Sequence, residues 1–144
     1  MMKSYAVILL LLLTSITTSC NSDDNDPISE VCDFLGVVDD NQINTVNPQT
    51  YVIQSVEVTG SCLQVELSSG GCDGNSWEVR LFGSSEVEAS LPPKREIGIR
   101  LDNSELCEAF ITKTYSFELT PFQVGGESII LILQDWEAQI LYEY

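Results

Sequence analysis

The chain is 144 residues long and strongly acidic, with 22 Asp and Glu against 6 Lys and Arg and a formal net charge of −16 at pH 7. A field of this sign repels phosphate groups, which argues against nucleic acid as a partner and against membrane binding through a basic surface. The sequence contains no His, so Ser-His-Asp and Cys-His catalysis are excluded.

Residues 1–19 have the pattern of an export signal. Lys3 supplies a positive charge, and an unbroken apolar run from Tyr5 to Leu13 follows it. The run has about half the length that a membrane-spanning helix needs. Its consecutive leucines also lack the spacing of an amphipathic helix that packs on a core. We therefore predict a signal peptide over 1–19 that is removed from the mature chain.

The residues after the apolar run predict a lipid anchor at Cys20. The stretch "ITTSC" resembles the lipobox of bacterial lipoproteins, in which the cysteine receives a diacylglyceryl group and becomes the mature N-terminus. The large apolar residue, Ile16, lies one place earlier than in the usual pattern. The resemblance implies a protein attached to the outer membrane through lipid.

An acidic run follows the predicted anchor directly, with Ser22, Asp23, Asp24 and Asp26 after Cys20. This run resembles the export signal that marks lipoproteins of Bacteroidetes-type bacteria for the outer face of the outer membrane. A solvated tether is the alternative interpretation, and the two roles are compatible. The frame of a calcium loop is missing. We assign 20–48 to the acylated cysteine, the acidic tether and an irregular segment, and 49–144 to a β domain.

From Tyr51 the pattern changes to the two-residue period of β-strands. Gly60-Ser61 suits a two-residue hairpin loop, because Gly adopts a positive φ without strain. Five strands are expected to alternate between an inward and an outward face before residue 120. The residues expected to face inward, strand by strand, are Val52, Val56 and Val58; Leu63, Val65 and Leu67; Trp77, Val79 and Leu81; Ile97, Ile99 and Leu101; and Cys107, Ala109, Ile111, Tyr115, Phe117 and Leu119.

The remaining segments complete a seven-strand prediction without a helix in the mature chain. A longer loop is expected from Gly83 to Lys94, closed by Pro92-Pro93. The stretch "SIILILQ" is apolar on both faces, as a central strand would be, and "EAQILYEY" pairs with it through a turn over 134–137. The fold class predicted is all-β, a single antiparallel β-sandwich of immunoglobulin-like type, with a closed barrel as the alternative.

Four cysteines remain once Cys20 is lipidated. An even number in an exported chain indicates two disulfides, although four cysteines permit three pairings. We favour Cys72 with Cys107, at the end of a Gly-Gly loop and the start of a strand, and by elimination Cys32 with Cys62. No metal and no cofactor are expected, because the chain lacks His and any C-x-x-C pair.

Three stretches, "GGCDGNSWEVRLFG", "LCEAFITKTYSFELTP" and "LQDWEAQILYEY", resemble a set of small, uncharacterised Bacteroidetes-type lipoproteins over about residues 60–144. The resemblance implies a fold and a location but no activity. Members of the set often carry a His shortly after Gly-Gly-Cys, where this chain has Asn75 and Ser76. No role that depends on His therefore carries over.

The function expected is that of a non-catalytic binding or accessory module for nutrient capture or adhesion, with a glycan or an envelope protein as partner. The alternative is a structural or interaction subunit of an envelope complex. Candidate binding elements are the Gly70–Asn75 loop, Lys94 with Arg95, and Trp136, which is either a platform for sugars or a packing residue. Paired carboxylates, such as Glu105 with Glu108, are interpreted as exposed charges rather than as a catalytic dyad.

Overall fold

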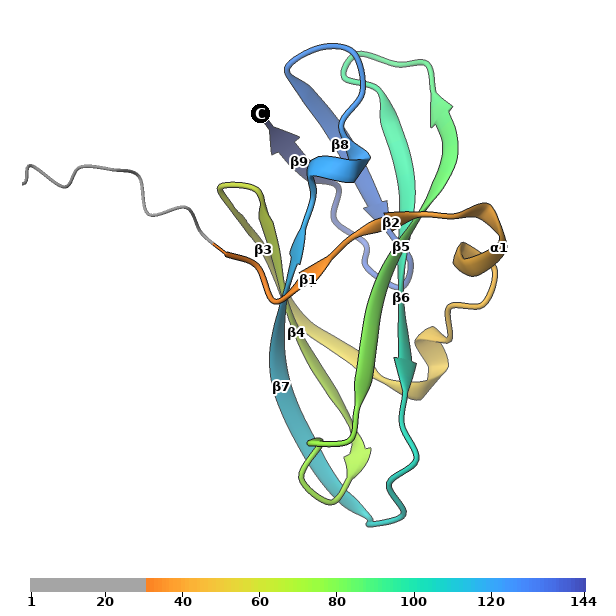
Figure 1. The fold of residues 1–144 in the computed structure, drawn as a ribbon, viewed down its shortest axis with the longest axis vertical. Helices are drawn as coiled ribbons and strands as arrows, with labels where there is room; N and C mark the ends of the chain where they lie inside the picture. The colour runs from red at the N-terminus through yellow and green to blue at the C-terminus, as the bar shows by residue number, and fades with distance from the viewer. Residues whose placement is uncertain (1–30) are drawn as a thin grey trace, which may run out of the picture.

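The computed structural model describes residues 31–144, and the predicted signal peptide, Cys20, Ser22, Asp23, Asp24 and Asp26 lie outside this range. The described chain is all-β and forms two sheets (Figure 1). One sheet has the strand order β1-β7-β4-β3 and the other β2-β5-β6-β8-β9. The strands are β1 (Phe34–Leu35), β2 (Val37–Val38), β3 (Val52–Thr59), β4 (Cys62–Gly71), β5 (Glu78–Glu88), β6 (Lys94–Asp102), β7 (Ala109–Glu118), β8 (Ser128–Leu133) and β9 (Ile140–Glu143).

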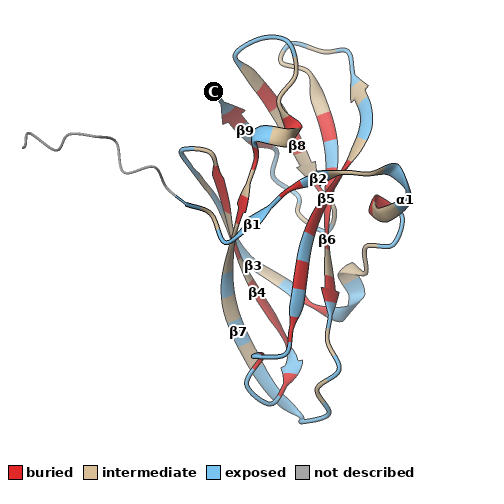
Figure 2. Cartoon of the chain, viewed as in Figure 1, coloured by how far each residue is buried: buried red, intermediate tan, exposed pale blue. Residues whose placement is uncertain are grey.

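One hydrophobic core lies between the two sheets and takes side chains from both (Figure 2). Along β4, β5 and β6 the inward residues alternate with more exposed ones, as the sequence pattern predicts. Complete burial of an aliphatic side chain stabilises the fold by roughly 1.5–3 kcal/mol, so these three strands supply much of the stability. The inward residues of these strands are Leu63, Val65, Leu67, Val79, Leu81, Ile97, Ile99 and Leu101.

The prediction of seven antiparallel strands is wrong in number and in direction. Residues 34–43, assigned to an irregular segment, contain β1, β2 and the short helix α1 (Asp40–Ile43). The pairs β1–β7, β2–β5 and β6–β8 are parallel. Single helical turns of the 3-10 type also occur at Pro48–Thr50 and Thr120–Phe122. Within residues 31–144, no helix is both long and apolar enough to cross a membrane.

Two bulges account for the errors within β3 and β5, whereas Cys107 and Ala109, also expected to face inward, are exposed just before and at the start of β7. In β3 the register shifts between Ile53 and Ser55, so Ile53 packs against the core while Val52, expected inside, is 51% exposed. In β5 the register shifts between Gly83 and Val87, and the strand then continues to Glu88. The long loop expected over 83–94 is therefore mostly strand, because extra residues in a bulge interrupt alternation without ending the pairing.

Several local predictions are confirmed. Thr59 pairs with Cys62 across the Gly60-Ser61 loop, and Gly60 has a φ of 55°. Strand β8 lies between β6 and β9, in the central position that its two apolar faces predict. The disulfides are Cys32–Cys62 and Cys72–Cys107, which are the pairs that the sequence analysis favours.

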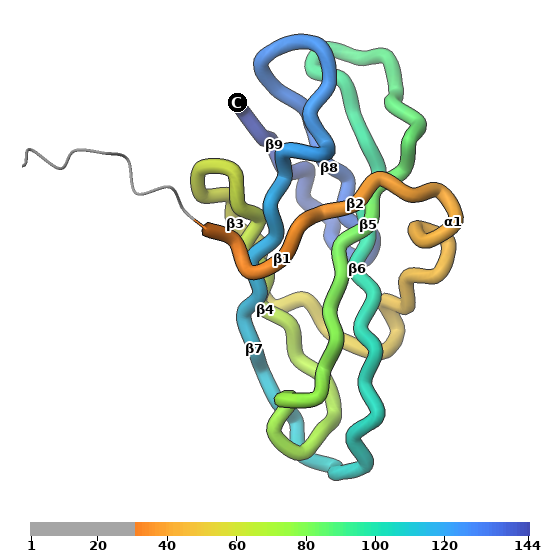
Figure 3. Tube along the Cα trace, viewed as in Figure 1, coloured from red at the N-terminus to blue at the C-terminus, as the bar shows by residue number. Residues whose placement is uncertain are grey.

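The chain passes from one sheet to the other at Gly36, between β1 and β2 (Figure 3). This crossing leaves room for the fully buried ring of Phe122. A Cβ atom at Gly36 would lie 2.5 Å from Phe122 Cε2, and one at Gly83 would lie 2.7 Å from Phe122 Cε1. Both glycines are therefore required by close packing around one aromatic ring.

Candidate functional site

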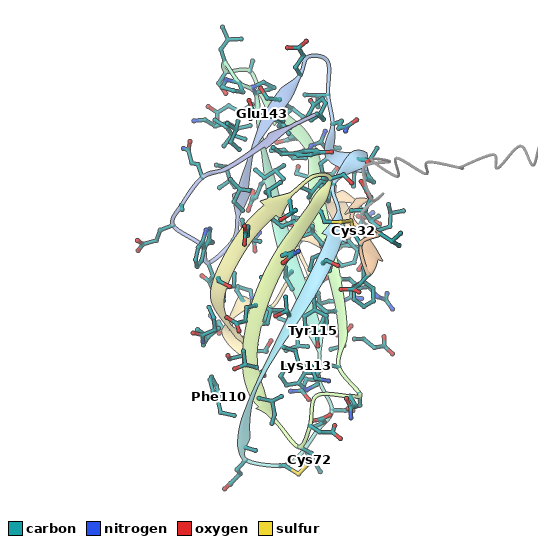
Figure 4. All side chains as sticks on the ribbon, turned by 90° about the vertical axis from the view of Figure 1, so that its left-hand side faces the viewer. Cys32, Cys72, Phe110, Lys113, Tyr115 and Glu143 are labelled. Carbon is teal, nitrogen blue, oxygen red and sulfur yellow. A yellow bond between two sulfur atoms is a disulfide. The ribbon has the colours of Figure 1, made fainter. Side chains whose placement is uncertain are left out.

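The structure places the three sequence candidates at three separate positions. The Gly70–Asn75 segment connects β4 to β5 at one end of the molecule, where Cys72 and Phe110 lie (Figure 4). Trp136 lies in the turn between β8 and β9. Lys94 and Arg95 begin β6 beside the β5 bulge. The structure therefore does not bring the candidates together into one site.

Glu105 organises the first candidate, and the sequence analysis did not assign it this role. Its Oε2 accepts hydrogen bonds from the backbone N–H groups of Cys72, Asp73 and Gly74, and its Oε1 accepts one from the Ser76 hydroxyl. Burial alone would raise the pKa of Glu105, but the N–H groups of Gly74 and Cys72 and the Ser76 hydroxyl outweigh it and lower the pKa to about 2. The donors that could hold an anionic ligand are thus occupied by a side chain of the protein itself.

Further contacts fix the same loop from outside. The Cys72–Cys107 disulfide joins it to the segment after Glu105, with the two Cα atoms 4.8 Å apart. Lys113 Nζ donates to Asn75 Oδ1 over 2.9 Å. Beside this rigid loop, Leu106 and Phe110 are 95% and 67% exposed. We interpret the Gly70–Asn75 loop as a structural element that supports an exposed apolar tip, defined by Leu106 and Phe110.

Trp136 is half-buried and packs against the edge of the core. It lines an open hollow of about 430 Å³ together with Ile53, Asp135, Glu137 and Ala138. Asp135 has a φ of 60°, in the left-handed region, and the N–H of Trp136 donates to the Leu133 carbonyl, which closes the turn. The turn therefore presents the indole from a defined backbone position, and the sequence-predicted platform residue does line a hollow.

The polar groups around this hollow are available for a ligand. Within residues 31–144, the indole N–H of Trp136 donates no hydrogen bond, and the atom is not shielded from solvent, unlike the indole N–H of Trp77. The carboxylates of Asp135 and Glu137 accept no hydrogen bond and form no ion pair with any residue that the structure describes. The hollow therefore combines an aromatic surface with one free donor and two free carboxylates.

Lys94 and Arg95 line a second concave surface, a polar hollow of about 370 Å³ at the β5 bulge. It adjoins another hollow of about 400 Å³ that shares Ser84, Glu86 and Glu96 with it. We call the two together the bulge groove. Its further lining residues are Asp40, Ile43, Asn44, Val87, Glu88, Lys94, Arg95, Ile132 and Gln134.

Side chains from outside the bulge hold its backbone in place. Asp40 Oδ1 accepts from the Ser85 N–H over 2.7 Å and from the Ser84 hydroxyl over 3.2 Å. The hydroxyl and the N–H of Ser85 lower the pKa of Asp40. Arg95 Nη1 donates to the Ser84 carbonyl over 2.6 Å. A sequence pattern of two-residue alternation could not find this arrangement, because Asp40 reaches the bulge from α1.

The described residues contain no group of three or more Asp, Glu, Cys or His side chains placed to hold a metal ion. The sequence matches no family model, and no curated protein matches it.

One solved structure is similar, the crystal structure of a protein of unknown function, DUF1344, from Bacteroides vulgatus. The TM-score is 0.51 and the sequence identity is 12% over 77% of this chain. The match covers 56% of that chain, so this chain corresponds to little more than half its length. The likeness therefore concerns the fold alone, and its source agrees loosely with the Bacteroidetes-type resemblance.

Proposed function

We propose that the protein is a lipid-anchored, non-catalytic β-sandwich module that binds glycans on the outer face of the outer membrane. The observation that carries the binding role is the Trp136 hollow. An indole presents a large, rigid apolar face at low entropic cost, and its N–H remains available for a polar partner. Sugars combine an apolar ring face with hydroxyl groups. These hydroxyls can donate hydrogen bonds to the free carboxylates of Asp135 and Glu137.

The location rests on sequence features and agrees with the disulfides. The apolar run, Cys20 and the acidic run after it support export and acylation. Disulfides persist in oxidising compartments and are rare in the cytosol, so two of them support an exported chain. The net negative charge leaves lipid as the means of attachment.

Glycan binding is tested with the purified full-length protein on a polysaccharide array, followed by calorimetry on each hit. Trp136→Ala should weaken binding by about ten-fold or more, the size of a contact worth over 1.4 kcal/mol. Trp136→Phe, which keeps an aromatic ring against the core, should retain part of the affinity. Phe110→Ala removes an exposed aromatic elsewhere and serves as the matched control. The absence of any glycan ligand, or equal binding by Trp136→Ala, would contradict the proposal.

The anchor and the surface location need separate experiments. Cys20→Ala should release the protein from the membrane fraction, and retention with normal processing would refute acylation. Replacement of Asp23, Asp24 and Asp26 by Ala should leave acylation intact but move the protein away from the cell surface. Unchanged protease accessibility on whole cells would reduce the acidic run to a tether.

A structural or interaction role within an envelope complex is the second candidate, and the apolar tip favours it. Leu106, in the segment before β7, and Phe110, at the start of β7, are strongly exposed beside a loop that a disulfide and Glu105 hold in place. Large exposed apolar side chains on a rigid support are typical of protein contacts. Pull-down of envelope proteins by wild type but not by Leu106→Ser/Phe110→Ser would support this role, whereas identical pull-down profiles would exclude the tip.

A further inference from the structure

The bulge groove contains a buried cation whose hydrogen-bonding capacity is only partly used. Arg95 is 7% exposed, and its guanidinium carries five N–H donors. It donates to a single acceptor among residues 31–144, the Ser84 carbonyl. Its Nε is buried without an acceptor, while Nη2 has no acceptor either but is not shielded from solvent. The bond that holds the bulge therefore uses only one of the five N–H donors of Arg95.

Burial lowers the pKa of Arg95 and the charge of Asp40 offsets this in part, but no carboxylate of the described chain lies within ion-pair distance of Arg95. The ion pairs within 4.0 Å join Arg80 to Glu78 and Arg100 to Asp102, and none includes Arg95 or Lys94. Burial of a charge without an ion pair is costly. The chain has 22 acidic residues, yet none of those described forms an ion pair with Arg95. An anionic group supplied by a ligand would accept a hydrogen bond from Arg95 Nη2 and form an ion pair with the Lys94 ammonium.

The same groove contains carboxylates that are equally free. Glu86 and Glu88 accept no hydrogen bond from any residue in the described range, although Glu88 lies directly opposite Lys94 in the β5–β6 register. Glu96 accepts one hydrogen bond, from Gln134 Nε2 over 2.7 Å. Lys94, Glu86 and Glu88 therefore line one hollow without an ion pair between them, although the charge of Asp40, at the adjoining hollow, acts on Arg95.

A lining with separated charges of both signs complements a ligand that also carries both. We infer that the bulge groove binds a small zwitterion, namely a free amino acid or a short peptide with unblocked ends. The ligand carboxylate lies at Arg95 and Lys94, and the ligand ammonium lies at Glu86 and Glu96. The volume of about 370 Å³ is that of a small-molecule site, and Ile132 offers a small apolar surface for a side chain. This site is independent of the Trp136 hollow.

The test measures equilibrium binding of L-alanyl-L-alanine to the purified full-length protein, beside its N-acetylated and its C-amidated forms. The free dipeptide should bind saturably, and each blocked form should bind about ten-fold more weakly, as expected for loss of one charge-assisted contact. Lys94→Gln and Glu86→Gln should each weaken the free dipeptide by a similar factor. Lys113→Gln, which removes a cation from β7 in the other sheet, is the matched control and should leave dipeptide binding unchanged.

Each remaining outcome overturns the inference. Equal binding of the C-amidated form would show an ordinary cation site, and equal binding of the N-acetylated form would show a simple anion site. Absence of saturable binding, or binding that Lys94→Gln and Glu86→Gln leave unchanged, would exclude the groove. Trp136→Ala should not affect dipeptide binding, so failure of the glycan proposal and failure of this one are distinguishable.

Discussion

Removal of the Cys72–Cys107 disulfide should destabilise the domain by about 2–4 kcal/mol. The bond closes a loop with a sequence separation of 35, for which loop-closure entropy in the unfolded chain gives about 3.8 kcal/mol at 25 °C. The Cys32–Cys62 bond closes a loop with a separation of 30, and the logarithmic dependence makes its entropic contribution almost the same. Differences between the two bonds must therefore arise in the folded state.

The folded state does differ, because Cys62 is fully buried whereas Cys72 and Cys107 are exposed. Cys72→Ala/Cys107→Ala leaves no cavity in the core. Cys32→Ala/Cys62→Ala removes a sulfur atom from a buried position and leaves a cavity. This cavity adds about 1 kcal/mol to the loss in the free energy of unfolding. The buried disulfide should thus be the more costly one to remove, by about that amount.

Urea unfolding of the purified variants measures both costs. Cys72→Ala, Cys107→Ala and the double variant should agree within about 0.5 kcal/mol, because either single change already breaks the bond. A cost below about 1 kcal/mol for the exposed bond would refute the chain-entropy reasoning. Non-reducing peptide mapping provides the check on connectivity, and recovery of Cys72 linked to Cys32 or Cys62 would refute the pairing itself.

Three further predictions concern single side chains. Gly83→Ala should destabilise by about 1–3 kcal/mol through its contact with Phe122, and Phe122→Leu should restore part of the loss in thermal unfolding of the double variant. The pKa of Glu105 is lowered from 4.5 to about 2 in the folded state, so its contribution to stability is complete above pH 4.5 and is lost as the pH falls toward 2. The difference in urea midpoint between wild type and Glu105→Gln should therefore shrink over that range. A constant difference would show that the ionised carboxylate does not hold the loop. Asp40→Asn should weaken the bond to the Ser85 N–H and raise hydrogen exchange at Ser85 specifically, which an unchanged exchange profile would contradict.

The sequence pattern predicts those parts of the fold in which a strand pairs regularly and faces the core on one side. Leu63, Val65 and Leu67 alternate without interruption, and their complete burial follows from the pattern. The inward position predicted for Val52 is wrong because the bulge between Ile53 and Ser55 shifts the register, and where a bulge falls depends on how the partner strand pairs. Strands β1 and β2, with two residues each, are too short to show any period.

The candidate sites show the same division. Trp136 could be identified as a possible platform by residue type, but its hollow requires Ile53, contributed by a distant strand of the other sheet. The role of Glu105 could not be predicted, because its hydrogen-bond donors lie in a different loop, which the fold brings close. Lys94 and Arg95 can be identified from the sequence as an adjacent basic pair, whereas the lack of hydrogen-bond partners at Glu86 and Glu88 is a property of the folded surface.

The position of the Cys32–Cys62 disulfide determines how the domain responds to mechanical tension on the chain that precedes residue 31. Strand β1 alone would resist a pull poorly, because it has only two residues, which pair with Phe117 and Glu118. The disulfide transfers the force covalently to Cys62, at the start of β4. Strand β4 pairs with β7 along its whole length and with β3 on its other side. A pull from the proposed anchor therefore reaches an internal strand bonded on both edges and bypasses the two-residue strand β1.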